Sequence, residues 1–265
     1  MQWENLTAPD FASAVKETGV CVMAFGVVER HSDHLPLGTD FLNGHKLACL
    51  AAEKEPAVVF PPWYFGQIFE ARCFPGTIAI KPTLLLELIT AVLDEIGRNG
   101  FKKIVLLSAH GGNSALLPFI AQSTLWEQKP YTLYLFRGNL IEEDRKVWEQ
   151  TVETELHGHA CECETSISLA NHPELVHMDR VPEPEVGATR GRLAGIKGGM
   201  SGIWWYGDYP EHYAGDAKTA TAEKGRILRE LSVNALARYI KAVKDDAVTP
   251  ELEQEFFERE AKLRK

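Results

Sequence analysis

The chain has 265 residues, 45% hydrophobic and 25% charged, so it can bury a full core and is too polar for a membrane bundle. Its 28 Lys and Arg against 37 Asp and Glu give a formal net charge of −9, which argues against non-specific binding to nucleic acids or anionic membranes. There is no apolar run of the roughly 18 residues that span a membrane and no signal-peptide pattern at the N-terminus. The five cysteines are odd in number and scattered, so we expect a cytoplasmic protein with reduced thiols.

The predicted elements alternate between helices and short buried strands. A helix begins after Thr7, with Asp10 three residues later as in a capping box, and ends near Gly19. The next run is apolar at every position, which is typical of a strand buried on both faces of a parallel sheet. We predict such strands at residues 20–25, 57–60, 78–80, 104–107 and 131–136, and helices at 41–54, 83–98 and 217–244. This order predicts βαβ units in a three-layer α/β/α sandwich with a mostly parallel central sheet.

We expect one domain over residues 1–265, with its core at about 5–245 and a short charged helix at about 250–265. A further helix follows Asn113, whose side chain is placed to cap it. Pro118 lies inside that helix and is expected to delay its start or to bend it. Residues 181–216 are rich in glycine, proline and aromatic residues and are expected to be irregular.

Polar side chains follow the two strands that are predicted most clearly. Glu29 and His31 come after the first strand, and Asp40 stands at the start of the next helix. His110 follows the fourth predicted strand and precedes two glycines, which permit a tight turn and a close approach of the backbone. Ligands of open parallel sheets bind outside the carboxyl ends of the strands. We therefore expect these side chains to lie near one another.

A third segment, residues 157–166, adds two histidines and two glutamates. Imidazole and carboxylate without thiolate form a ligand set for zinc, manganese or iron. Because a carboxylate can bridge, two ions can share such a site. The sequence therefore predicts a metal centre.

The three segments resemble the creatininase family of metal-dependent amidohydrolases. The resemblance runs through about residues 5–245 and rests on Glu-x-His with Leu-Pro-Leu-x-Thr-Asp (29–40), His-Gly-Gly-Asn (110–113) and His-Ala-x-Glu-x-Glu-Thr-Ser (159–166). It implies an α/β/α fold, a binuclear metal centre that hydrolyses a C–N bond of a small amide, and assembly into homohexamers. Zinc is the first expectation for both ions, with manganese or iron as alternatives.

Carried over by position, the resemblance implies that Glu29 and His110 bind one ion and His31 the other, with Asp40 bridging both. Glu162 is then expected to complete the second ion.

Two further residues are predicted to be catalytic. The resemblance matches His159 to the family's catalytic histidine, which protonates the departing nitrogen, although a ligand role for this side chain is the alternative. It matches Glu164 to the second acidic position, beside the ligands rather than on an ion.

The predicted substrate is a small amide, cyclic or open. His110 is followed by Gly-Gly where true creatininase has Tyr-Glu, which argues against creatinine itself. Two alternatives stay open. One is a formamide deformylase or peptide-processing hydrolase of the same family, and the other is an inactive binding protein that holds metal.

Some side chains are left without an assigned role. Cys161 and Cys163 are spaced too closely for a zinc knuckle, and we expect small, buried, reduced thiols. His157 is expected either to contact substrate or to lie in solvent. An aromatic cluster is expected to form either a substrate wall or a subunit contact: Trp204, Trp205, Tyr206 and Tyr209.

Overall fold

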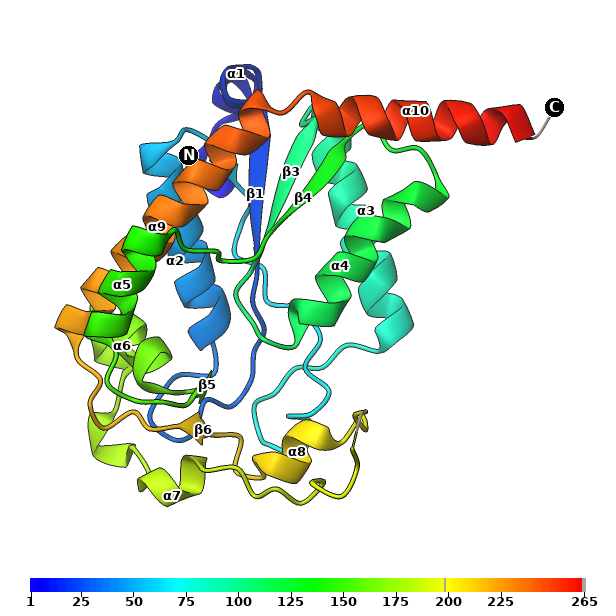
Figure 1. Ribbon diagram of the computed structural model, residues 1–265. Coiled ribbons are helices and arrows are strands. Elements are labelled where there is room, and N and C mark those ends of the chain that lie inside the picture. The colour runs from blue at the N-terminus through cyan, green and yellow to red at the C-terminus, as the bar shows by residue number, and fades with distance from the viewer. Residues whose placement is uncertain (198, 264–265) are drawn as a thin grey trace.

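The computed structural model describes residues 1–197 and 199–263, and its centre is a four-stranded parallel sheet between two layers of helices (Figure 1). The strand order is β2-β1-β3-β4, and every neighbouring pair is parallel. The predicted α/β class with a mostly parallel sheet is therefore confirmed. The strands are β1 (Val20–Phe25), β2 (Val58–Val59), β3 (Lys103–Ser108) and β4 (Thr132–Phe136).

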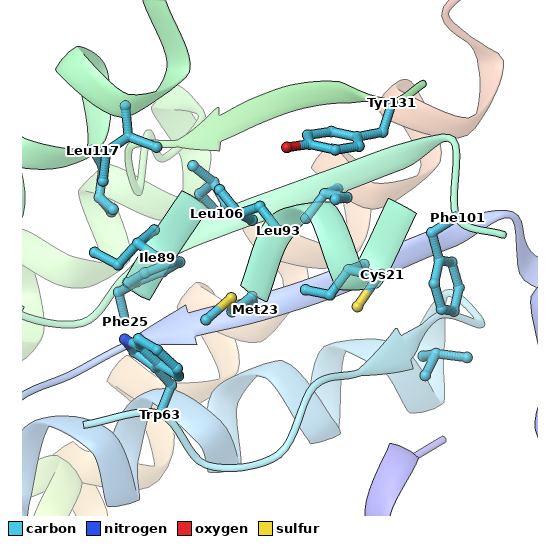
Figure 2. Packing of buried hydrophobic residues seen from close by; sticks show 14 of the residues in the cluster. Cys21, Met23, Phe25, Trp63, Ile89, Leu93, Phe101, Leu106, Leu117 and Tyr131 are labelled. Atoms are coloured by element: carbon cyan, nitrogen blue, oxygen red, sulfur yellow. The ribbon is translucent and has the colours of Figure 1, made fainter. Parts of the chain in front are cut away.

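Both faces of the sheet are covered because alternate residues of each strand point to opposite sides. Cys21, Met23 and Phe25 of β1 pack into a cluster with α1, α3 and α4, part of which Figure 2 shows. Val22 and Ala24 pack on the other side, against α2 and α9. This arrangement explains why β1 is apolar at every position. The helices of the two layers are α1 (Ala8–Thr18), α3 (Pro82–Arg98) and α4 (Asn113–Ser123), and α2 (Thr39–Lys54) and α9 (Ala222–Asp245).

The helix α6 (Glu162–Asn171) packs closely along α9 and extends the second layer. Gly225 of α9 permits the contact, since a Cβ there would lie 1.8 Å from the carbonyl oxygen of Ser166. The helix α5 (Glu142–Thr151) also packs on α9. Together these contacts hold the start of α6 near the carboxyl edge of the sheet.

The segments that follow the sheet gather at one end of the molecule. Strands β5 (His157–His159) and β6 (Ala214–Gly215) form an antiparallel pair beyond the carboxyl end of β1, close to α8 (Trp204–Asp208), while α10 (Val248–Leu263) projects from the opposite end (Figure 1). The remaining short helices are η1 (Trp3–Asn5), η2 (Thr124–Trp126), η3 (Pro173–Leu175), η4 (Met178–Arg180) and α7 (Pro184–Gly187). Within the described residues, no helix has the length and apolar character that a membrane crossing needs.

Two local predictions are wrong. Residues 78–80 form no strand, because Ile78 is 43% exposed and its amide makes a single hydrogen bond to Val28 rather than joining the sheet. Asn113 does not cap α4; its buried amide donates to the carbonyl of Phe25 instead. Pro118 does not delay the start of α4, and the bend that was its alternative stays a prediction.

The C-terminal helix starts earlier than expected. It begins at Val248 because the carboxylate of Asp246 accepts the amide hydrogens of Val248 and Thr249. Residues 264–265 of the expected helix lie outside the described residues.

Candidate metal centre

Two carboxylates and two histidines meet, buried, at the carboxyl ends of β1 and β3. His110 Nδ1 lies 2.7 Å from Glu29 Oε1 and 3.1 Å from Asp40 Oδ2. His31 Nε2 lies 2.9 Å from Asp40 Oδ1. The carboxylate of Asp40 thus stands between the two imidazoles. Four of the side chains that the sequence predicts as ligands are brought together.

The start of α2 approaches β1 closely because residue 26 is a glycine. A Cβ at Gly26 would lie 2.3 Å from the backbone nitrogen of Phe41, so any other residue would push α2 away from the strand. Asp40 occupies the first turn of α2 and is therefore held beside the segment that carries Glu29 and His31. Local backbone packing thus positions the bridging carboxylate.

Backbone carbonyl groups orient both histidines. His110 Nε2 donates to the carbonyl of Gln67 at 2.8 Å, and His31 Nδ1 lies 3.3 Å from the carbonyl of Glu29. Each ring therefore presents its other nitrogen to the carboxylates, and that nitrogen could bind a metal once it has released its proton. Metal-binding histidines in proteins are held by a donated N–H in this way.

The cluster requires positive charge. Glu29 Oε1 and Asp40 Oδ2 are buried, and beyond their ion pairs with His110 Nδ1 they have no hydrogen-bond partner among the described residues. Burial lowers the pKa of His31, but Asp40 beside it outweighs burial and raises that pKa to about 10. Burial likewise opposes protonation of His110, yet Glu29 and Asp40 hold its pKa well above the ordinary value. A divalent cation would supply the same positive charge in place of these ring protons, so the residues fit the predicted metal.

Glu164 joins this cluster and Glu162 does not. Ligand atoms of His31, Asp40 and Glu164 all lie within 4.8 Å of one another, and so do those of Glu29, Asp40 and His110. Glu162 instead accepts hydrogen bonds from Lys224 and from the amides of neighbouring residues.

The expected ligand role of Glu162 is therefore corrected by the geometry. Successive residues of a helix differ by about 100°, so Glu162 and Glu164 of α6 point to nearly opposite sides. His159 lies on β5 before the helix begins, and the spacing from His159 to Glu162 is not a helical turn. Glu164 is the acidic residue of this segment that faces the cluster.

His159, predicted to be catalytic, lies beside the cluster. Its Nε2 donates to the carbonyl of Arg30 at 2.8 Å and stands 4.0 Å from Glu29 Oε2. Its ring is 4.2 Å from that of His31, centroid to centroid. Burial and His31 lower the pKa of His159 well below the ordinary value. The side chain is thus fixed next to the predicted ligands.

His212 is a buried member of the site that the sequence did not indicate. Its Nε2 donates to Glu29 Oε2 at 2.5 Å, and its Nδ1 accepts the indole hydrogen of Trp205 at 3.1 Å. Trp205 therefore fixes the tautomer that holds Glu29. The only indication in the sequence was that His212 stands close to the aromatic residues 204–209. Because His212 lies in the irregular stretch, no predicted strand or helix indicated where its side chain would point.

The aromatic cluster divides between the site and the surface. The ring of Trp205 lies 6.0 Å from that of His159, whereas Trp204 and Tyr206 are 40% and 37% exposed. Trp205 therefore borders the predicted catalytic residue.

A parallel sheet with clustered carboxylates and imidazoles at its carboxyl edge defines an α/β protein with a site that could hold metal ions. The family model "Creatinine amidohydrolase" matches residues 4–240. The chain belongs to the creatininase family.

Curated relatives cover most of the chain. The 3-dehydro-scyllo-inosose hydrolase of Thermotoga maritima is 27% identical over 92% of this chain and 82% of its own length. The creatinine amidohydrolase of Pseudomonas putida is 25% identical over 89% and 95%. The mycofactocin precursor peptide peptidase of Mycolicibacterium smegmatis is 30% identical over 83% and 84%. These relatives are hydrolases of differing substrates.

Solved structures share the fold. A crystal structure of creatinine amidohydrolase (creatininase) has a TM-score of 0.77 at 23% identity, over 90% of this chain and 96% of that chain. A structure titled "Creatininase Mn" has a TM-score of 0.72 at 21% identity, over 91% and 97%. Another is of the "Zn-Zn type". The likeness confirms the three-layer architecture.

Proposed function

We propose that this protein hydrolyses a C–N bond of a small amide, using two divalent ions held by Glu29, His31, Asp40, His110 and Glu164. The observation that carries this proposal is the convergence of buried carboxylate oxygens and imidazole nitrogens on the carboxyl edge of the sheet. Zinc is the metal we propose first, with manganese or iron as alternatives, because imidazole and carboxylate accept all three.

The bound ions would lower the pKa of a water molecule and polarise the scissile carbonyl group. Asp40 fixes His31 and His110 relative to each other, since one of its carboxylate oxygens faces each ring. Glu29 is fixed by the N–H of His212, so its orientation is set before substrate arrives. His159 stands beside these groups, and burial and His31 hold its pKa low, so its ring is neutral and would first accept the proton that the attacking water releases. It would then pass this proton to the departing nitrogen, which is a poor leaving group until it is protonated.

The substrate we propose is a small amide other than creatinine. Gly111 and Gly112 follow His110, and a Cβ at Gly112 would lie 2.1 Å from the side chain of Gln67, so position 112 leaves no room for a larger residue, whereas a Cβ at Gly111 would meet nothing within 4 Å. The match to a peptide peptidase supports a short peptide as the second candidate substrate. We also propose a cytoplasmic homohexamer, which light scattering of the purified protein tests directly.

Metal content and turnover test the proposal together. Protein purified without chelator is expected to contain about two ions per chain by elemental analysis. A panel of cyclic amides, formamides and short peptides is then screened. Any turnover should be abolished by chelator and restored by added zinc or manganese. A chain that binds no metal would overturn the proposal, and two tightly bound ions without turnover on the whole panel would favour the binding-protein alternative.

A further inference from the structure

A second group of metal-ligating side chains lies outside the carboxylate cluster. Ligand atoms of His157, Cys161 and Cys163 all lie within 4.8 Å of one another. Cys163 Sγ is 3.8 Å from His157 Nδ1. The proposed reaction uses none of these three side chains.

A strand, a turn and a helix bring the three residues together. His157 belongs to β5, Cys161 is the residue before α6, and Cys163 lies in its first turn. Ala160 between them has a positive φ of 52°, which reverses the chain from the strand into the helix. The short Cys-x-Cys spacing, which excludes a zinc knuckle, is therefore complemented by a histidine across the turn.

Neighbouring residues hold this arrangement. Gly215 of β6 pairs with His157, and a Cβ at Gly215 would lie 2.6 Å from the Cβ of Cys161. The ring of Trp148 meets the edge of the His157 ring at a centroid distance of 4.9 Å. The absence of a side chain at Gly215 thus leaves room for Cys161, and Trp148 packs against the imidazole of His157.

The spacing fits a tetrahedral ion. With Zn–S of about 2.3 Å and Zn–N of about 2.0 Å, a tetrahedral site separates sulfur from nitrogen by about 3.6 Å. The observed 3.8 Å between Cys163 and His157 is close to that value. Cys161 is buried whereas His157 is exposed, so solvent reaches one side of the group.

We propose that His157, Cys161 and Cys163 bind a thiophilic divalent ion, Zn²⁺ in the first place, with a fourth position open to water. Two thiolates and one imidazole form a softer ligand set than the carboxylates of the proposed catalytic centre. The two sites therefore differ in the ligands that a spectroscopic probe detects.

Cobalt is the probe that separates the two sites. Co²⁺ bound by thiolate gives an intense near-ultraviolet charge-transfer band, which imidazole and carboxylate ligands do not give. The full-length protein is reduced with a phosphine, stripped of metal and titrated with Co²⁺. We expect the band to saturate at the intensity of one thiolate-bound ion per chain, whatever cobalt the carboxylate cluster also takes up. The band requires a cysteine ligand, so it does not depend on cobalt in the carboxylate cluster. It would therefore persist even if that cluster bound no metal.

Two variants and one control complete the test. Cys163→Ser is expected to weaken cobalt binding and to keep at most half of the band, because one thiolate of two remains, and its fold should persist because the side chain is only partly buried. His157→Asn should weaken the binding that the band reports. Cys73→Ser, at an exposed cysteine elsewhere in the chain, should keep the band unchanged. Absence of the band in the reduced wild-type protein, or an undiminished band in folded Cys163→Ser, would overturn the proposal.

Discussion

Replacing Glu162 by glutamine separates a structural carboxylate from a metal ligand. The carboxylate of Glu162 is fully buried and accepts hydrogen bonds from Lys224, from the amide of Glu153 and from the amide and hydroxyl of Thr154. Glutamine keeps the shape but loses the charge. We therefore expect Glu162→Gln to destabilise the protein and to leave its metal content intact.

The magnitude follows from the electrostatics of this carboxylate. Burial opposes its ionisation, but Lys224 and Thr154 lower the pKa of Glu162 from 4.5 to about 2. At about 1.4 kcal/mol per pKa unit, the charged form gains about 3 kcal/mol from its surroundings. Lys224 keeps a second partner in Glu153 at 2.6 Å, which moderates the loss. We expect the free energy of unfolding to fall by about 2 kcal/mol.

Glu164→Gln is the matched variant on the same helix. Burial raises the pKa of Glu164 to about 8, so in the metal-free protein at pH 7 its carboxyl is mostly neutral and glutamine should cost under about 1 kcal/mol. The metal content of Glu164→Gln as purified, however, should fall. Urea denaturation of both metal-free variants and elemental analysis of both as purified provide the comparison. Metal lost from Glu162→Gln but kept in Glu164→Gln would refute the assignment.

Other substitutions test the rest of the site. His159→Asn should keep metal and fold while turnover falls roughly 10²–10⁴-fold, and a lost ion would instead identify a ligand. His212→Phe should weaken metal affinity about 10–100-fold, measured by competition with a chelator, and an unchanged affinity would exclude an orienting role. Asp40→Ala should retain at most one ion by elemental analysis. Gly225→Ala should lower the free energy of unfolding in urea by about 2 kcal/mol or more, whereas exposed Gly195→Ala should change it little.

The strands that support the site were predictable because burial on both faces leaves a simple pattern. Residues 20–25 and 104–107 are apolar throughout, and both form strands at the centre of the sheet. Residues 78–80 show the limit of that pattern. A three-residue apolar run also suits an irregular segment, in which Ala79 and Ile80 pack against buried residues while Ile78 is exposed.

The candidate site was predictable where the end of a strand determines the position of the residues that follow it. Glu29 and His110 follow β1 and β3, and parallel neighbours place them together. The choice of Glu162 over Glu164 came from the resemblance alone, and the sequence did not indicate which face of α6 turns toward the cluster. His212 comes from a stretch with little regular structure, so its contact with Glu29 depends on tertiary packing alone.

The contact between Glu29 and His212 joins groups that are 183 residues apart in the chain. His34 and Thr165, which are hydrogen-bonded at 2.9 Å, are separated by 131 residues. Closing loops of this length costs chain entropy before any contact forms, so local helices and the β1–β3 pair should assemble earlier in folding. The centre is therefore expected to be among the last parts of the molecule to form. A cation that binds only the completed centre should slow global unfolding and leave the early folding steps unaffected.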